Sequence, residues 1–304
     1  MTALFIVNPL SQRVAQKGSR LSPYAQPCGA QIYEINNFKN LANVVVNAAK
    51  SRVKYVFIEG GDGTAQGVLS AFLQQSDIFP TFPDFAIIAG GMTNQVAKNI
   101  GLKPSLVKAA LAGELRLKPM PLLNVEISDG NVYNGFLFST GAVPMVTDYT
   151  KSKLHKRGIG GSFAVAGGIL KGISANNDEV LYPTEISVTC ESANIDIQTA
   201  HIGTILTTLP SLIMGLDPFW GSREAPLRLT YVGENPRRLY RNIISLWRGN
   251  KTKDRSQDGL QSWNIDHVNY QYNGPCVLDG EPLMMADGIF RITPTRPINF
   301  IQAQ

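Results

Sequence analysis

The strongest constraint on the fold is an alternation of short apolar runs and helix-like patterns in the first third of the chain. The runs ALFIV (3–7), AQIYEI (30–35), KYVFIE (54–59) and DFAIIA (84–89) have the length and composition of buried strands. The segments between them carry apolar residues at helical spacing, namely Leu41, Val44, Val45 and Ala48, then Ala65, Val68, Leu69 and Phe72. This alternation predicts βαβ units and a parallel sheet covered on both faces.

Two more helices follow the fourth strand. One opens at Thr93 or Asn94 and ends at Gly101, and the next begins after Pro104. At 304 residues the chain is long enough for two domains. We place the first over residues 1–120 and the second over 121–304, with the last residues packing back on the first domain as an open alternative.

The remainder predicts antiparallel strands. LNVEIS and NVYNGFLF flank an Asp129-Gly130 turn, TEISVTC and NIDIQTAHIGTIL form another pair, PLRLTYV is a further strand, and VNYQY-NG-PCVLDG is a late hairpin. One helix, Leu239–Trp247, interrupts these strands, and residues 248–262 have the composition of a mobile loop. The expected fold class is therefore α/β plus all-β, an α/β domain with a parallel sheet followed by an antiparallel β-sandwich.

Composition limits the cellular compartments and the kinds of ligand that we expect. Three cysteines and three histidines are widely scattered, which favours a reducing, cytoplasmic setting and argues against a disulfide framework or a zinc cluster. No window has 18 consecutive apolar residues, so we expect no spanning helix. The net charge of +5 and the pI of about 9.0 suit an acidic ligand or an anionic membrane surface. We expect no nucleic-acid partner.

The stretch EGGDGT (59–64) lies where a strand ends and a helix begins. Ligands of open α/β sheets bind at that edge, and glycines there let the backbone approach a phosphate. A tight turn capped by Asp62 would explain the same residues. No GxxxxGK[ST] occurs, and the dinucleotide fingerprint fails because Ala89, not an acidic residue, closes the next strand. Asp62 beside phosphates would call for Mg²⁺ between them.

Two neighbouring junctions have similar chemistry. Asn8-Pro9 follows the first strand, and Gly90, Gly91, Thr93 and Asn94 follow the fourth. Three such strand ends on one edge favour a nucleotide cleft.

These motifs resemble the diacylglycerol kinase catalytic family of lipid kinases, which includes sphingosine and ceramide kinases and is distantly related to NAD kinases. The matching residues, in order, are Asn8-Pro9, Gly60–Thr64, Gly91–Asn94, FLFSTGAV (136–143) and Leu278–Glu281. The resemblance implies an α/β nucleotide domain, a β-sandwich lipid domain and ATP in the cleft between them.

The resemblance also assigns roles. Glu281 would be the general base for the lipid hydroxyl, and Asp62 would act on Mg²⁺ or on that hydroxyl. Asp279 would contact the metal of Mg-ATP. The residues implied in nucleotide binding are Asn8, Gly60, Gly61, Asp62, Gly63, Thr64, Gly91, Thr93, Asn94, Asp279 and Gly280.

Some positions depart from the family pattern. Gln12 stands where the family has a glycine, and Met92 where it has a threonine that touches the nucleotide. Asp217 is a candidate for a second metal site. Lys156 and Arg157 are candidate phosphate contacts, or part of a solvated loop. Asp148 is a candidate lipid-headgroup contact.

Basic residues surround the predicted helix at 239–247, and they are Arg237, Arg238, Arg241, Arg248, Lys251 and Lys253. Such a cluster fits either a solvated face over a core helix or contact with an anionic bilayer.

The leading hypothesis is an ATP- and Mg²⁺-dependent kinase that phosphorylates a hydroxyl of diacylglycerol or a similar lipid, peripherally bound to the inner face of the membrane. One alternative is a kinase of another acceptor, a sphingoid lipid or NAD. The other is a catalytically weak nucleotide- or lipid-binding protein, suggested by Gln12 and Met92. A homodimer is left open.

Overall fold

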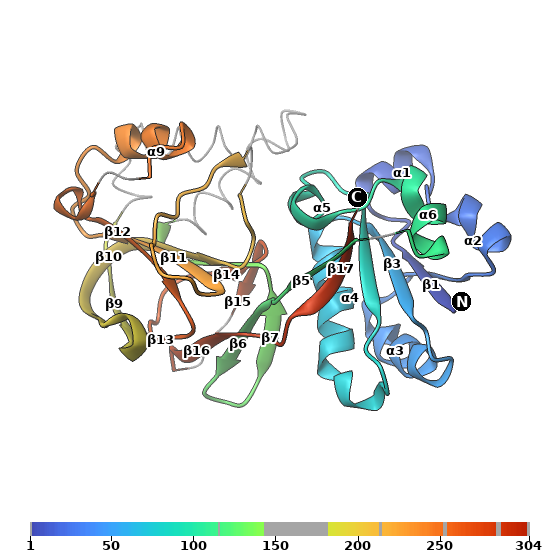
Figure 1. The fold of residues 1–304 in the computed structure, drawn as a ribbon. Helices are drawn as coiled ribbons and strands as arrows, with labels where there is room; N and C mark the ends of the chain where they lie inside the picture. The colour runs from blue at the N-terminus through green and yellow to red at the C-terminus, as the bar shows by residue number, and fades with distance from the viewer. Residues whose placement is uncertain are drawn as a thin grey trace. The chain divides into compact units, whose positions relative to one another are not determined.

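The computed structural model describes residues 2–114, 116–142, 182–212, 215–251, 254–283 and 287–302. The chain divides into two compact units, Met1–Met120 with Arg296–Gln304, and Pro121–Thr295. The first is an α/β unit and the second an antiparallel β unit, which confirms the predicted α/β plus all-β fold class (Figure 1).

Strands and helices alternate in the first unit. Its described elements are β1 (Ala3–Val7), α1 (Gln12–Lys17), α2 (Ser22–Cys28), β2 (Gln31–Glu34), α3 (Leu41–Lys50), β3 (Tyr55–Gly60), α4 (Asp62–Gln74), β4 (Asp84–Ala89), α5 (Gln95–Ile100), α6 (Val107–Ala112), β5 (Arg116–Met120) and β17 (Ile298–Gln302). β1 to β4 match the predicted strands, α3 and α4 match the helices predicted from apolar periodicity, and α5 and α6 match those predicted from start and stop residues. Helices α1 and α2 were not predicted, since each is only two turns long or less and carries few buried residues.

The strands of this unit form a sheet in the order β2-β1-β3-β4-β17-β5. All neighbours are parallel except β17 and β5. Strands β2 and β3 flank β1 on opposite sides, so the strand order reverses at β1. Ligands of open α/β sheets bind outside the carboxyl ends of strands at such a switch point. Here that point lies between β1 and β3.

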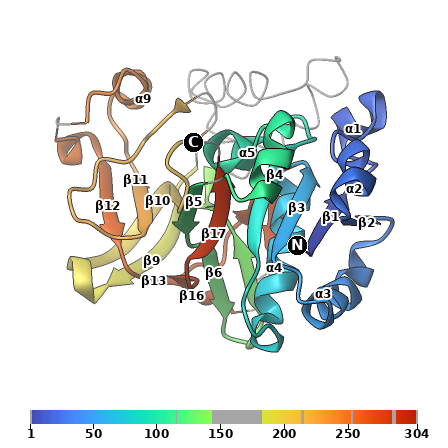
Figure 2. The same ribbon diagram turned by 45° about the vertical axis from the view of Figure 1, so that its right-hand side comes forward.

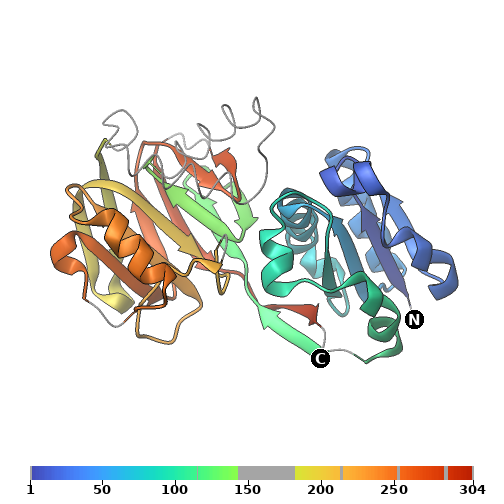
Figure 3. The same ribbon diagram turned by 90° about the horizontal axis from the view of Figure 1, so that it is seen from above.

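Both faces of this sheet are buried. Phe5, Phe57 and Ile88 point into a core that includes Val14 of α1 and Val107 of α6. The residues that alternate with them along β1, β3 and β4 are also buried, as expected for a parallel sheet between helical layers. Figure 3 shows helices on the two sides of the sheet.

The second unit is built from antiparallel strands and α9. Its described elements are β6 (Leu123–Ile127), β7 (Val132–Gly135), β8 (Leu137–Thr140), β9 (Thr184–Cys190), β10 (Ile195–Thr207), β11 (Leu227–Gly233), α9 (Leu239–Trp247), β12 (Leu260–Ile265), β13 (Val268–Gln271), β14 (Cys276–Leu278), β15 (Glu281–Leu283) and β16 (Ile289–Pro294).

These strands belong to one curled sheet (Figure 2). The main path is β15-β14-β8-β10-β9-β13-β16-β6-β7, and β11 pairs with β10 and β12. The long strand β10 pairs with β9 through its first half and with β8 and β11 through its second. A register shift in the β10–β11 pairing lies between His201 and Gly203. The curled sheet encloses a core that contains Leu206, Leu229 and Phe290.

The predicted hairpin between VNYQY and PCVLDG is wrong. β13 pairs with β9 and β16, whereas β14 pairs with β8 and β15. Asn273 and Gly274 lack the positive φ that a two-residue type I′ turn requires. Pro275 follows them and has no N–H to donate to a hairpin ladder.

In the described part of residues 248–262, regular structure begins earlier than the predicted loop allows. Ser256–Asp258 forms a 3₁₀ turn, and β12 starts at Leu260. The Arg255 side chain is fully buried and donates to the carbonyl of Asn250. Its guanidinium carbon lies 5.0 Å from the ring centroid of Trp220. Arginine is seldom buried, but stacking and hydrogen bonding hold this one inside.

His201 is buried at the register shift of β10. Its Nδ1 donates to the carbonyl of Thr184 at 2.8 Å, so Nε2 is the nitrogen that faces the Thr140 hydroxyl, also at 2.8 Å. The same hydroxyl lies 2.9 Å from Thr204 Oγ1. Burial lowers the pKa of His201, because the imidazolium form would lose its hydration.

Candidate active site

The junctions after β1, β3 and β4 meet at one edge of the parallel sheet. Asn8 Nδ2 donates to Thr64 Oγ1 at 2.8 Å, which joins the first junction to the start of α4. The N–H of Gly61 donates to Ser11 Oγ at 3.3 Å. The N–H of Gly90 donates to the carbonyl of Gly60 at 2.7 Å, which joins the second junction to the third. These contacts lie at the switch point between β1 and β3.

Most glycines of these junctions lie where the neighbouring atoms leave no room for a side chain. A Cβ on Gly60 would lie 2.5 Å from the Thr64 side chain, and one on Gly90 would lie 2.9 Å from the Cα and N of Gly60. A Cβ on Gly91 would overlap the Cα of Gly61. The two glycine turns therefore touch backbone to backbone, and side chains would force them apart.

Gly63 is different. It is exposed, and a Cβ built on it would meet no atom within 4 Å. It lies in the first turn of α4, whose N-cap is Gly61, a residue without a side chain to cap the helix. A helix N-terminus with open space before it can bind an anion through its backbone N–H groups.

Asp62 connects α4 to α5. Its Oδ1 accepts the N–H of Val96 at 2.8 Å, and its Oδ2 accepts the Thr93 hydroxyl at 2.6 Å. The carboxylate thus caps the first turn of α5 and has a fixed orientation. It is partly exposed, so its remaining lone pairs are accessible to a ligand. The predicted nucleotide contact of Thr93 stays a prediction, and the structure shows its hydroxyl donating to Asp62.

Asn94 shapes the third junction. It adopts the left-handed conformation, with φ of 50°, which asparagine tolerates better than most residues. Its side chain accepts the N–H of Gly91 at 2.8 Å and donates to the Gly91 carbonyl at 2.7 Å. Asn94 therefore holds the turn that packs on Gly61. Met92, between Gly91 and Asn94 in the sequence, is exposed.

Sequence reasoning missed Glu59, the residue before Gly60. Its carboxylate is fully buried and bonds to Arg13 Nη2 at 2.6 Å and to Ser19 Oγ at 2.6 Å. It also accepts the backbone N–H groups of Arg20 and Leu21. Glu59 thereby fastens the segment after β1 to the end of β3. A carboxylate closing an otherwise apolar buried strand was the signal that could have revealed it.

Asp279 and Gly280 form a two-residue hairpin turn between β14 and β15, with φ of 51° and 89° as a type I′ turn requires. The Asp279 carboxylate accepts the N–H of Phe136 and of Leu137, both at 2.9 Å. It therefore holds the break between β7 and β8. The predicted nucleotide and metal contacts of Asp279 and Gly280 remain predictions. Glu281 opens β15 and is exposed.

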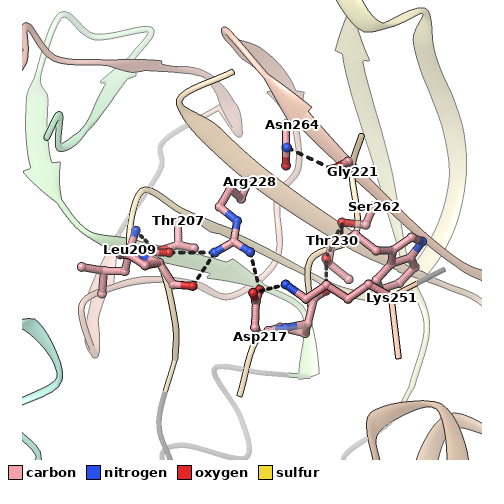
Figure 4. A network of polar contacts seen from close by, with 12 residues as sticks. Thr207, Leu209, Asp217, Gly221, Arg228, Thr230, Lys251, Ser262 and Asn264 are labelled. Atoms are coloured by element: carbon pink, nitrogen blue, oxygen red, sulfur yellow. Dashed lines mark hydrogen bonds and ion pairs between the residues drawn. The ribbon is translucent and has the colours of Figure 1, made fainter. Parts of the chain in front are cut away.

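Asp217 lies in a network of cations, shown in Figure 4. One carboxylate oxygen pairs with Arg228 and the other with Lys251. Arg228 also donates to the carbonyl of Leu209 at 3.1 Å. The structure therefore gives this carboxylate a charge-balancing role, and the metal role stays a prediction. In the described residues, no three His, Cys, Asp or Glu side chains converge on a point that could hold a metal ion.

The candidate residues Lys156, Arg157 and Asp148 lie outside the described residues. Within the described ranges, no helix has the length and apolar character needed to cross a bilayer.

This architecture, an open parallel sheet in one unit and an antiparallel sheet in the other, is a fold of known kinases. A crystal structure of a diacylglycerol kinase from Bacillus anthracis matches with a TM-score of 0.63 at 13% identity, over 99% of this chain and 96% of that chain. A second structure from the same organism gives a TM-score of 0.69 at 14% identity, over 98% and 96%. An NAD kinase from Archaeoglobus fulgidus, solved in complex with ATP, gives 0.50 at 11% identity, over 99% and 93%.

The sequence gives a more specific match for the first part of the chain. Residues 2–124 match the family model of the diacylglycerol kinase catalytic domain. The match includes the junctions after β1, β3 and β4. This match supports a phosphotransferase of the kinase type. No curated protein matches the sequence.

Proposed function

We propose that this protein transfers the γ-phosphate of ATP to a hydroxyl group of diacylglycerol or a closely related lipid. The observation that carries the proposal is the convergence of three glycine- and polar-rich junctions at the switch point of a diacylglycerol kinase catalytic domain. The ATP complex of the NAD kinase with the same fold supports ATP as the donor.

The residues at this edge suit a nucleotide triphosphate. The first turn of α4, with exposed Gly63 at its second position, would bind phosphate oxygens through backbone N–H groups. Asn8 and Thr64, hydrogen-bonded to each other, and Gly60, Gly61 and Gly91 would shape the cradle. Asn94 and Thr93 would hold the neighbouring turn, and each retains acceptor capacity toward a ligand.

Mg²⁺ fits this donor set as a companion of ATP. Mg²⁺ in kinase sites keeps several waters and binds one or two carboxylates together with substrate phosphates. Asp62, partly exposed and fixed by two hydrogen bonds, offers one such carboxylate beside the cradle. Bound there, Mg²⁺ would neutralise phosphate charge. The described residues offer no protein-only cage, which agrees with a metal carried in by ATP.

Glu281 is our proposed general base. It is exposed, and the rigid Asp279-Gly280 turn fixes its backbone. As the lipid hydroxyl oxygen forms its bond to the γ-phosphorus, Glu281 would take the hydroxyl proton. The bond from the γ-phosphorus to the bridging oxygen breaks, and ADP leaves.

An assay with radiolabelled ATP tests the proposal. Diacylglycerol, a sphingoid base and ceramide are offered in mixed micelles, with NAD as a soluble acceptor. We expect labelled phosphatidic acid with wild-type protein and a loss of about 10²–10⁴-fold in turnover with Glu281→Gln, at unchanged ATP affinity. Labelling of NAD alone would make the protein an NAD kinase. If no product is labelled although the protein still binds ATP, the protein would be a nucleotide-binding protein and not a kinase of these acceptors.

A further inference from the structure

Helix α9 buries one side and presents a basic side to solvent. Asn242 and Leu246 are buried, and Asn242 Nδ2 donates to Asp258 Oδ2 at 2.9 Å. Arg241, Ser245 and Arg248 follow each other at intervals of four and three residues, so they form a row beside the buried side, and Arg241 and Arg248 are exposed. Figures 1 and 2 show α9 beyond the end of β11, from which the chain enters it.

This basic side is hollowed. A cavity of about 450 Å³ is lined by Arg241, Ile244, Ser245, Arg248 and Asn250. Its lining is anchored from beneath, because buried Arg255 donates to the Asn250 carbonyl and, at 3.4 Å, to Ser245 Oγ. Two guanidinium groups, a hydroxyl and an amide line one cavity with a single aliphatic side chain. That set suits a phosphate group attached to an apolar body.

The surrounding charge is one-sided. Residues 237–255 contain Arg237, Arg238, Arg241, Arg248, Lys251, Lys253 and Arg255, against Asp254 as the one acidic residue.

Not all of these cations are available. Lys251 is paired with Asp217 (Figure 4), and Arg255 is buried. The other described arginines of this set, Arg237, Arg238, Arg241 and Arg248, are exposed, and none takes part in the ion pairs found among the described residues. Their charge is therefore free to attract an anionic surface.

We propose that this side of α9 is a docking surface for a membrane that contains anionic phospholipids. Headgroup phosphates bind Arg241 and Arg248 in the cavity, while half-buried Ile244 contacts the region where acyl chains begin. The half-buried Ile243 adds further apolar surface on the same helix. These aliphatic side chains among arginines favour a lipid surface over a nucleic acid, which would use charge and aromatic stacking.

The docking surface is distinct from the proposed catalytic residues. The claim concerns binding by the second unit and does not depend on turnover, so its failure would leave the kinase proposal standing.

Vesicle co-sedimentation tests it, without ATP or acceptor lipid. One set of vesicles is phosphatidylcholine alone, and the other is phosphatidylcholine and phosphatidylglycerol in equal parts. We expect wild-type protein to sediment with the anionic vesicles only. Arg241→Gln/Arg248→Gln should bind about 30-fold more weakly, since each basic residue near an anionic surface contributes about fivefold. At high salt, where charge is screened, Ile244→Ser should bind the anionic vesicles more weakly than wild-type protein does.

The matched control is Lys108→Gln/Arg291→Gln, which removes two exposed cations from α6 and β16. It should retain most of the binding, and thermal unfolding should show all variants folded. An equal loss of vesicle binding in the control and in the α9 variant would overturn the proposal, because the overall charge of the protein would then explain the binding. Equal binding of wild type and the α9 variant would also overturn it. So would binding to a DNA duplex that Arg241→Gln/Arg248→Gln abolishes, without binding to vesicles.

Discussion

Alanine substitutions at Gly90 and Gly63 should separate the packing role of the glycine turns from their ligand role. Both glycines belong to the junctions at the switch point, and neither has a positive φ that would itself forbid alanine. They differ in what a Cβ would meet. Gly90 is buried against the neighbouring turn, whereas Gly63 is exposed with open space around it.

For Gly90→Ala we expect lower stability. The new Cβ would lie 2.9 Å from the Cα and N of Gly60 and 3.0 Å from Cγ2 of Val14. Favourable carbon–carbon contacts lie at about 3.5–4.0 Å, so one turn must move by roughly half an ångström or more. Overpacking of this kind costs about 1–3 kcal/mol. In a unit of this size the thermal midpoint should fall by roughly 3–10 °C.

For Gly63→Ala we expect the opposite pattern. Alanine is the better helix former, by up to about 1 kcal/mol, so the thermal midpoint should hold or rise. The methyl group would instead occupy the space through which a phosphate reaches the first turn of α4. We expect ATP affinity to fall at least about tenfold, which lowers the stabilisation by saturating Mg-ATP by about 1.4 kcal/mol.

Thermal unfolding with and without Mg-ATP measures both effects on the same samples. Wild-type stability in Gly90→Ala would refute the argument that the two turns pack backbone to backbone. Wild-type stabilisation by Mg-ATP in Gly63→Ala would refute the placement of phosphate at the start of α4. Loss of stability in both variants would show that the open space at Gly63 does not exist in solution.

Four further substitutions probe the capping carboxylate Asp62, the buried carboxylate Glu59 and the histidine His201. Asp62→Asn should abolish Mg²⁺-dependent turnover, whereas Thr93→Val, which removes only the hydroxyl that donates to Asp62, should keep much of it; equal loss in a kinetic assay would make Asp62 a structural cap only. Glu59→Gln should lower the free energy of unfolding by about 3–5 kcal/mol in urea titrations, because Arg13 loses its buried partner, and a loss below about 1 kcal/mol would contradict this. Because burial lowers the pKa of His201, its stabilising contribution is present above the ordinary histidine pKa and is lost as pH falls below it. The free energy of unfolding should therefore fall below about pH 6.5, by at most about 1.4 kcal/mol per pH unit, and His201→Asn should flatten that dependence.

The sequence predicted the elements whose signal is local. Strands β1, β3 and β4 are apolar runs, and α9 has the predicted bounds, Leu239–Trp247, because its apolar residues recur at helical spacing. The predicted hairpin at Asn273-Gly274 failed because pairing partners are decided by the whole sheet. β13 and β14 each find two other neighbours. Strand β17, whose neighbour β4 lies about two hundred residues earlier, has no local signal for its place in the first sheet.

The site was predictable in part for the same reason. Parallel strands bring their carboxyl ends to one edge, so the meeting of Asn8 with Thr64 and of Gly60 with Gly90 follows from the element order. Side-chain pairing does not follow from that order. The spacing of Glu59 and Arg13 in the sequence does not indicate that they form a buried ion pair. The arginine comes from helix α1, which was not predicted.

The two motifs EGGDGT (59–64) and LDGE (278–281) divide their residues in the same way. In the first, Gly60 and Gly61 pack against the neighbouring turn, while Gly63 and part of Asp62 face solvent. In the second, Asp279 holds the break between β7 and β8 with both oxygens, while Glu281, two residues later, is exposed. In each motif some residues build the backbone that holds the others in place. Substitutions at the packed positions should therefore lower stability and activity together, whereas Gly63 and Glu281 should affect ligand binding and turnover alone. Activity loss without stability loss at these two positions is what separates a catalytic motif from a well-packed turn.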